Sequence, residues 1–323
     1  MDALKRTADL GRLGDTPVKL SFKYVLLGIV ALASFSVTVS ANAAKILGEK
    51  PRYLLFGTSS VPNEQAILKM IWAPGLDEGY VPQGITVAEG AILLSSYKST
   101  DPKQDKGPCR VFRIDPVSGN DSGYFDLPED CGHAGGLAYL GRGALVVSDT
   151  RRLYKVDLDK AFREVKADAA IQSIVKLAGE LKGSFVDFDG TDLWIGSYEK
   201  EEVKAKLHRL TLKIFDGYDR KGAIKEDKAL SIIPIPAEAQ GLAFDRDGNL
   251  WLTASSSKHG RLFKLDPKTG IILTRYEMVI GIEDIGFDSD GKLWSVSEAG
   301  SQRWLKWSKI FPVLFQLDVS KLK

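Results

Sequence analysis

The sequence predicts an all-β fold, and within that class a β-propeller. One short pattern returns five times, in copies that begin at Gln83, Gly135, Ser184, Gln240 and Glu283. Consecutive copies lie 52, 49, 56 and 43 residues apart. Each copy consists of strand-like runs and turns, and strands that repeat at this period are typical of propeller blades.

The fourth copy shows the four strands that we expect in each blade. Asp247-Gly248 separates the first two strands, because this pair between apolar runs predicts a tight hairpin turn. The same pair recurs at Asp189 and Asp290, so we interpret these aspartates as turn formers and not as catalytic acids. A tryptophan that recurs in the second strand predicts packing between blades. The expected strands are residues 240–244, 250–254, 261–265 and 271–278, and the tryptophans are Trp194, Trp251 and Trp294.

The fifth copy ends without a fourth strand of its own, whereas an apolar run at residues 66–72 precedes the first copy. We expect residues 66–72 to complete the last blade, because closing the ring removes an exposed sheet edge. This arrangement gives five countable blades. Six blades stay possible if the N-terminal segment, including residues 53–56, forms a degenerate blade. We expect residues 45–323 to form a single domain.

Residues 1–44 have the pattern of a targeting segment. Basic residues precede an apolar run at residues 25–39, and small residues follow as far as Ala44. These are the features of a secretory signal peptide. The run is shorter than the roughly 20 residues of a typical membrane span, but an uncleaved signal anchor remains an alternative. In either case we expect residues 45–323 outside the cytoplasm, periplasmic or secreted, with a membrane contact only if the segment is uncleaved.

The sequence contains two cysteines, Cys109 and Cys131. An even number of cysteines in an oxidising compartment normally forms disulfides. Cys109 begins the third strand of the first copy, and Cys131 lies just before the second copy. We therefore expect a disulfide that links neighbouring blades.

Basic and acidic residues are nearly balanced, with 44 Lys and Arg, 42 Asp and Glu, and a formal net charge of +2. Nucleic-acid-binding proteins concentrate basic residues on one surface, so we expect no nucleic-acid partner. We interpret the small basic cluster of Arg303 and Lys306 as a solvated face. His208, in a third strand, is expected to be exposed.

Polar side chains recur where the first strand of each copy begins and where the second strand ends. Because these strands are antiparallel, both positions lie at the same end of every blade. Several polar groups that converge on one concavity predict a binding site, here at one mouth of the central channel. The ligand-binding candidates are Gln83, Gln240, Tyr97 and Tyr198.

The acidic residues at this mouth suggest a metal. Glu283, Asp284, Asp149 and Glu298 could hold one divalent cation, and calcium is favoured because it takes carboxylate and amide oxygens. His133 is the candidate catalytic residue, since it could move a proton near such a cation. The alternative is an inert ring of polar side chains that bond to one another. We interpret the aromatic segment at residues 304–311 as a cover over the last blade, with a lid or a membrane contact as alternatives.

Four motifs carry a family resemblance: Pro82-Gln83-Gly84-Ile85, residues 133–137, residues 240–245 with 247–251, and residues 282–286. On these motifs the chain resembles extracytoplasmic bacterial β-propellers of the broad gluconolactonase, strictosidine-synthase-like and NHL-repeat group. The resemblance implies a propeller, usually of six blades. For the lactonases of the group it implies a cation at the mouth, held by Glu, Asn and Asp. Glu283 and Asp284 match that ligand set, whereas Gln83 and Gln240 depart from it.

These features give one leading hypothesis and two alternatives. The leading hypothesis is an extracytoplasmic propeller that binds a small ligand or a protein partner at its polar mouth. The first alternative is a metal-dependent hydrolase of lactones or related esters. The second is an interaction scaffold that binds proteins through its outer loops.

Overall fold

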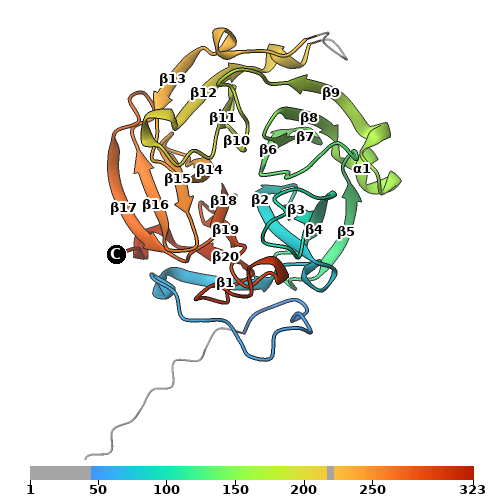
Figure 1. Ribbon diagram of the computed structural model, residues 1–323, viewed down its shortest axis with the longest axis vertical. Coiled ribbons are helices and arrows are strands. Elements are labelled where there is room, and N and C mark those ends of the chain that lie inside the picture. Colours follow the sequence, from blue (N-terminus) through green and yellow to red (C-terminus); the bar gives the residue numbers. More distant parts are fainter. Residues whose placement is uncertain (1–44, 217–221) are drawn as a thin grey trace, which may run out of the picture. The chain divides into compact units, whose positions relative to one another are not determined.

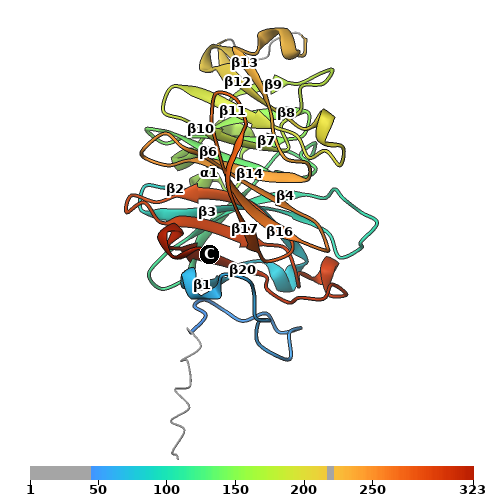
Figure 2. The ribbon, with the colours of Figure 1, turned by 90° about the vertical axis from the view of Figure 1, so that its left-hand side faces the viewer.

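The computed structural model describes residues 45–216 and 222–323, which contain five antiparallel four-stranded sheets. Figure 1 shows the sheets as five blades around a common centre, and Figure 2 shows the same ribbon from the side. The prediction of a five-bladed β-propeller is therefore confirmed. The expected signal segment, residues 1–44, lies outside the described residues.

The first three blades follow one another along the chain, and each runs from its inner to its outer strand. The first blade contains β2 (Tyr80–Ala88), β3 (Ala91–Lys98), β4 (Cys109–Ile114) and β5 (Asp121–Asp126). The second contains β6 (Gly136–Gly141), β7 (Ala144–Asp149), β8 (Arg152–Asp157) and β9 (Ile171–Lys176). The third contains β10 (Phe185–Phe188), β11 (Asp192–Gly196), β12 (Lys206–Thr211) and β13 (Ser231–Pro234).

The fourth blade has the same order, and the fifth combines both ends of the described chain. The fourth contains β14 (Ala239–Phe244), β15 (Leu250–Ser255), β16 (Gly260–Leu265) and β17 (Ile272–Met278). The fifth contains β18 (Ile282–Phe287), β19 (Leu293–Ser297), β20 (Val313–Leu317) and, as its outer strand, β1 (Ile67–Trp72). β1 runs antiparallel to β20, with Ile71 opposite Leu314. The described residues before β1 add no sixth sheet.

Helical structure is short and lies between the strands. The α-helix α1 spans Leu158–Glu164, and the Asp157 side chain caps it by accepting the N–H of Lys160. No helix in the described ranges is long and apolar enough to cross a membrane. The 3-10 helices are Glu64–Ala66, Leu76–Glu78, Asp168–Ala170, Glu202–Lys204, Leu212–Phe215, Glu226–Lys228, Gln302–Trp304 and Val319–Lys321.

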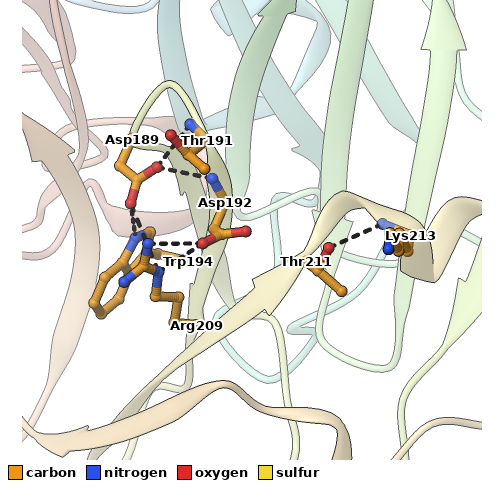
Figure 3. A network of polar contacts seen from close by, with 7 residues as sticks. All are labelled: Asp189, Thr191, Asp192, Trp194, Arg209, Thr211 and Lys213. Carbon is orange, nitrogen blue, oxygen red and sulfur yellow. Dashed lines mark hydrogen bonds and ion pairs between the residues drawn. The ribbon is translucent and has the colours of Figure 1, made fainter.

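Aspartates fix the hairpins between first and second strands to the recurring tryptophans. In the third blade, Oδ1 of Asp189 accepts the N–H groups of Thr191 and Asp192, and Oδ2 accepts Nε1 of Trp194 at 2.7 Å (Figure 3). Asp245 holds Trp251 in the same way at 2.9 Å, and Asp288 holds Trp294 at 3.0 Å. In the fourth and fifth blades this acid therefore lies two residues before the aspartate of the Asp-Gly turn.

The tryptophans pack between blades, as expected. The ring centroids of Trp194 and Phe244, which belongs to the next blade, are 5.4 Å apart, and those of Trp251 and Phe287 are 6.2 Å apart. A disulfide joins Cys109 in β4 to Cys131, which precedes β6, so the expected disulfide is confirmed.

The sequence-based interpretation was wrong for two polar side chains. His208 is only 1% exposed, because the insertion between β12 and β13 places Glu226 against it with Nε2 3.0 Å from the carboxylate. Arg303 is only 7% exposed and lies in the connection between β19 and β20, so it does not belong to a solvated face.

Candidate functional site

A pocket of about 790 Å³ lies at one mouth of the propeller. Its lining comes from all five blades, at the starts of the inner strands and the ends of the second strands. From the inner strands, or from just before them, the lining includes Gln83, His133, Ser184, Gln240 and Glu283. From the second strands, or from just after them, it includes Tyr97, Thr150, Tyr198, Ser255 and Glu298. The antiparallel connection of each first hairpin brings these two sets together.

Two glutamates of the fifth blade share the lining. Glu283 lies near the start of β18 and Glu298 directly follows β19, and they are 2% and 8% exposed. Their carboxyl groups are hydrogen-bonded to each other. Two buried carboxyl groups in contact cannot both ionise easily, so they form a carboxyl pair that retains a proton.

Neutral side chains complete the hydrogen bonds of this carboxyl pair. Gln240 Nε2 donates to Glu283 Oε1 at 3.0 Å. Trp304 Nε1 donates to Glu298 Oε2 at 2.7 Å, and Gln83 Nε2 donates to the same oxygen at 3.3 Å. The donors therefore come from the first and fourth blades and from the β19–β20 connection, which fixes the pair relative to three parts of the ring.

Burial raises the pKa of both carboxyl groups. The pKa of Glu283 lies well above its usual value because of burial and of the neighbouring charge of Glu298. Burial also raises the pKa of Glu298, to about 7, although the bonds from Trp304, Gln83 and Glu283 act in the opposite direction.

Aromatic side chains form the walls of the pocket. The rings of Tyr97 and His133 stack at 4.6 Å, and those of Trp304 and Trp307 stack at 4.7 Å. Burial, followed by the charges of Glu238 and Glu283, raises the pKa of Tyr198 to about 12, so its hydroxyl remains protonated at neutral pH. Trp304 and Trp307 belong to the segment that we interpreted as a cover, and both line the pocket.

Arg303 connects two of these walls. One Nη1–H of Arg303 donates to the Tyr97 hydroxyl, and Nη2 donates to the carbonyl of Pro102 at 3.2 Å. The centre of its guanidinium lies 4.3 Å from the centroid of the Trp304 ring. Within the described part of the chain, the hydrogen-bond partners of the Arg303 side chain are therefore neutral.

The ligand-binding candidates from the sequence all line this pocket: Gln83, Gln240, Tyr97 and Tyr198. His133 lines it as well, with Nδ1 2.9 Å from the carbonyl of Asp105. Burial lowers the pKa of His133, so its imidazole is neutral near pH 7.

Of the metal candidates, Glu283 and Glu298 meet, whereas Asp284 and Asp149 do not join them. Glu283 faces the pocket, whereas Asp284 accepts the N–H groups of Ile85 and Leu137 at 3.1 and 3.3 Å. Successive side chains of a strand point to opposite faces, which explains this separation. Asp149 accepts the N–H groups of Gly132 and His133 at 3.2 and 2.8 Å and so shapes the loop before β6.

These four side chains do not fit the calcium centre that we expected. No group of three or more His, Cys, Asp or Glu side chains within residues 45–216 and 222–323 could hold a metal ion. Calcium requires six to eight oxygen ligands around one point. Asp149 and Oδ2 of Asp284 instead accept backbone N–H groups, while Oδ1 of Asp284 is buried without a partner in the described structure.

Sequence reasoning missed Arg303 and the role of Trp304. Both lie in residues 298–312 between β19 and β20, a connection much longer than its counterpart, residues 256–259, in the fourth blade. That difference in length is visible in the sequence. It would have marked the connection as a part of the mouth.

Comparisons with known proteins point to the fold. No protein-family model matches the chain, and no curated protein matches it. Three similar solved structures are the glutaminyl cyclase of Myxococcus xanthus (13% identity, TM-score 0.51), the PQQ-bound aldose sugar dehydrogenase of Streptomyces coelicolor (14%, 0.47) and a protein assigned as a gluconolactonase (14%, 0.39). The respective matches cover 78%, 80% and 68% of this chain and 97%, 98% and 72% of the other.

The likeness to the Myxococcus xanthus structure, with its TM-score of 0.51, supports the resemblance at the level of the fold alone. At such low identities it establishes no activity, because one fold supports many unrelated functions. The function must be argued from the pocket itself.

Proposed function

We propose that this protein binds a small organic ligand in the pocket at its propeller mouth. The observation that carries the proposal is the carboxyl pair of Glu283 and Glu298, buried yet facing an open pocket of about 790 Å³. Small-molecule sites are typically concave, about 300–1,000 Å³ in volume, and lined by apolar walls with a few oriented polar groups. The stacked aromatic pairs supply such walls, and the carboxyl pair supplies such groups.

The energetics of burial support a binding role over an inert polar ring. A buried carboxylate without a cationic partner destabilises the fold. An inert ring would place amides and hydroxyls at these positions, since they satisfy one another without that cost. A ligand that completes the site would offset the cost each time it binds.

We place this binding protein outside the cytoplasm. The Cys109–Cys131 disulfide supports that location, because structural disulfides persist in oxidising compartments. The signal-like pattern of residues 1–44 supports it as well. A protein partner that inserts one side chain into the same pocket would use the same chemistry.

A second candidate is an acid–base enzyme that needs no metal. The specific observation is that burial raises the pKa of Glu298, to about 7, and also that of its neighbour Glu283. Two carboxyl groups with separated pKa values can serve as base and acid at neutral pH. In the hydrolysis of an ester or lactone, Glu298 would accept a proton from water, and Glu283 would donate one to the leaving oxygen.

A ligand screen tests the proposal. Thermal denaturation of the purified protein is followed with a library of small polar metabolites, and hits are repeated with Glu298→Gln. Glu164→Gln, an exposed position in α1, is the matched control. We expect hits that raise the Tm of the wild type and the control but not of Glu298→Gln. Hits that act equally on all three proteins would contradict a mouth site, and hydrolysis of an ester or lactone library would favour the enzyme.

A further inference from the structure

The buried residues of the pocket lining include two charges of opposite sign that have no ion-pair partner among the described residues. The other charged residues of the lining, Asp105, Lys106, Lys200, Glu238 and Lys258, are more exposed. The carboxyl pair of Glu283 and Glu298 supplies the negative charge, and Arg303 supplies the positive one. These two charges indicate the chemical class of the ligand. This inference rests on the proposed function, since it concerns the same pocket.

The negative end lacks a cation. Every side-chain donor to the carboxyl pair outside the pair itself is neutral, namely Gln83, Gln240 and Trp304. Within residues 45–216 and 222–323, no ion pair includes either glutamate. A primary ammonium group would provide both the missing charge and hydrogen-bond donors, and the aromatic walls favour a cation further.

The positive end lacks an anion. Arg303 lines the pocket and is more than nine-tenths buried, and its partners are the hydroxyl of Tyr97 and the carbonyl of Pro102. Its Nε is buried without any partner in the described structure. A guanidinium has five N–H donors in a planar fork that matches a carboxylate. A carboxylate is therefore the group that Arg303 lacks.

Trp304 joins the two ends. Its Nε1 donates to Glu298, while its ring lies 4.3 Å from the centre of the Arg303 guanidinium. One indole therefore contacts both charges, which fixes their separation at about the size of an indole ring. A small molecule that carries an ammonium and a carboxylate can reach both ends across this ring.

We propose that the mouth pocket recognises a zwitterion, with its ammonium group at Glu283 and Glu298 and its carboxylate at Arg303. Free amino acids and short peptides have this chemistry. The two differ in the distance between their charged groups, so probes of different length separate them.

Isothermal titration calorimetry at pH 8 provides the test. The probes are L-phenylalanine and glycyl-L-phenylalanine, with two half-probes: 2-phenylethylamine, which lacks the carboxylate and stays protonated at pH 8, and 3-phenylpropionate, which lacks the ammonium. We expect at least one zwitterion to bind ten-fold or more tightly than both half-probes. A preference for the dipeptide would identify peptides, and the reverse preference would identify amino acids.

Two substitutions assign the ends. Glu298→Gln should reduce the affinity for the preferred zwitterion to that of 3-phenylpropionate, and Arg303→Gln should reduce it to that of 2-phenylethylamine. Glu164→Gln and Arg246→Gln, both exposed, are the matched controls and should bind like the wild type. Since Arg303 is buried, its variant is first checked by thermal denaturation, and Arg303→Lys, which keeps the charge, should retain partial affinity.

The outcomes separate this inference from the proposed function. If the half-probes bind as tightly as the zwitterions, or if the metabolite screen yields only uncharged ligands that depend on Glu298, the zwitterion is excluded while the mouth still binds a small molecule. If neither the probes nor the screen yields a ligand that depends on Glu298, both proposals fail.

Discussion

Glu298 illustrates how burial of one carboxyl group affects the whole protein. Its pKa is about 7 in the folded chain, against a usual value of 4.5. The folded state therefore binds a proton that the unfolded state has already released. Its stabilising contribution is complete below about pH 4.5 and disappears as the pH rises through about 7.

We predict that Glu298→Gln weakens the pH dependence of stability. Between pH 4.5 and pH 8 the wild type should lose about 3 kcal/mol of unfolding free energy through Glu298 alone, since one pKa unit corresponds to about 1.4 kcal/mol. A glutamine has no proton to lose and keeps the hydrogen-bonding shape. Urea unfolding at several pH values measures the difference between the two proteins.

Other buried acids with raised pKa values also make the protein less stable as the pH rises. Burial raises the pKa of Asp187 to about 7, and it raises that of Asp284 well above its usual value. The variant should therefore retain part of the dependence, whereas Glu164→Gln should retain all of it. An unchanged slope in Glu298→Gln would mean that Glu298 titrates like an exposed carboxylate.

Among the elements, the first hairpin of each blade separates what the sequence could predict from what it could not. The Asp-Gly pairs predict turns correctly, because glycine takes the positive φ that the turns need, +76° at Gly248 and +72° at Gly291. The acid that bonds the tryptophan is Asp245 or Asp288, two residues earlier. The turn pattern does not reveal this, since the bond depends on how the indole crosses the hairpin.

We predict that Asp245→Ala is much more destabilising than Asp247→Ala. Asp245 accepts hydrogen bonds from Trp251, from Asn249 and from the N–H of Asp247, whereas Asp247 is exposed. Leaving the indole N–H and its neighbours unpaired should cost about 2 kcal/mol. The exposed substitution should cost less than about 0.5 kcal/mol.

Thermal or urea unfolding of the two variants provides the comparison. Trp251 fluorescence gives a second readout, because only Asp245→Ala should change the surroundings of that indole. Equal losses from both substitutions would show that the turn, and not the bond to the tryptophan, stabilises this hairpin.

At the scale of the molecule, repeats predict architecture better than chemistry. The period and the strand pattern predicted five countable blades and left a sixth open, and the structure has five. The antiparallel hairpins were sufficient to collect Gln83, Gln240, Tyr97 and Tyr198 around one pocket. Predicting the carboxyl pair would have required the register between β18 and β19, because this register decides which acids at the ends of the two strands meet. Arg303 and Trp304 lie in an insertion outside the repeat, where periodicity carries no information.

The junction between β1 and β20 joins the N-terminal strand of the described chain to its last blade. The N–H of Trp72 points away from β20, to the carbonyl of Leu47 at 3.0 Å. Hydrogen-bonding directions alternate along a strand, so the N–H of Ile71 faces β20. Proline at this position removes that donor and disturbs the ladder.

We predict that Ile71→Pro opens the ring, whereas loss of the buried Ile71 side chain alone does not. Ile71→Ala is the matched control, because it removes the same buried side chain and keeps the N–H. The alanine variant should unfold in one transition with a loss of about 2–4 kcal/mol. The proline variant should lose the single transition, with protease cleavage beginning near β1 and β20. If both variants unfold in one transition of equal midpoint, the ring does not depend on this ladder, and the blades are held by the contacts between them alone.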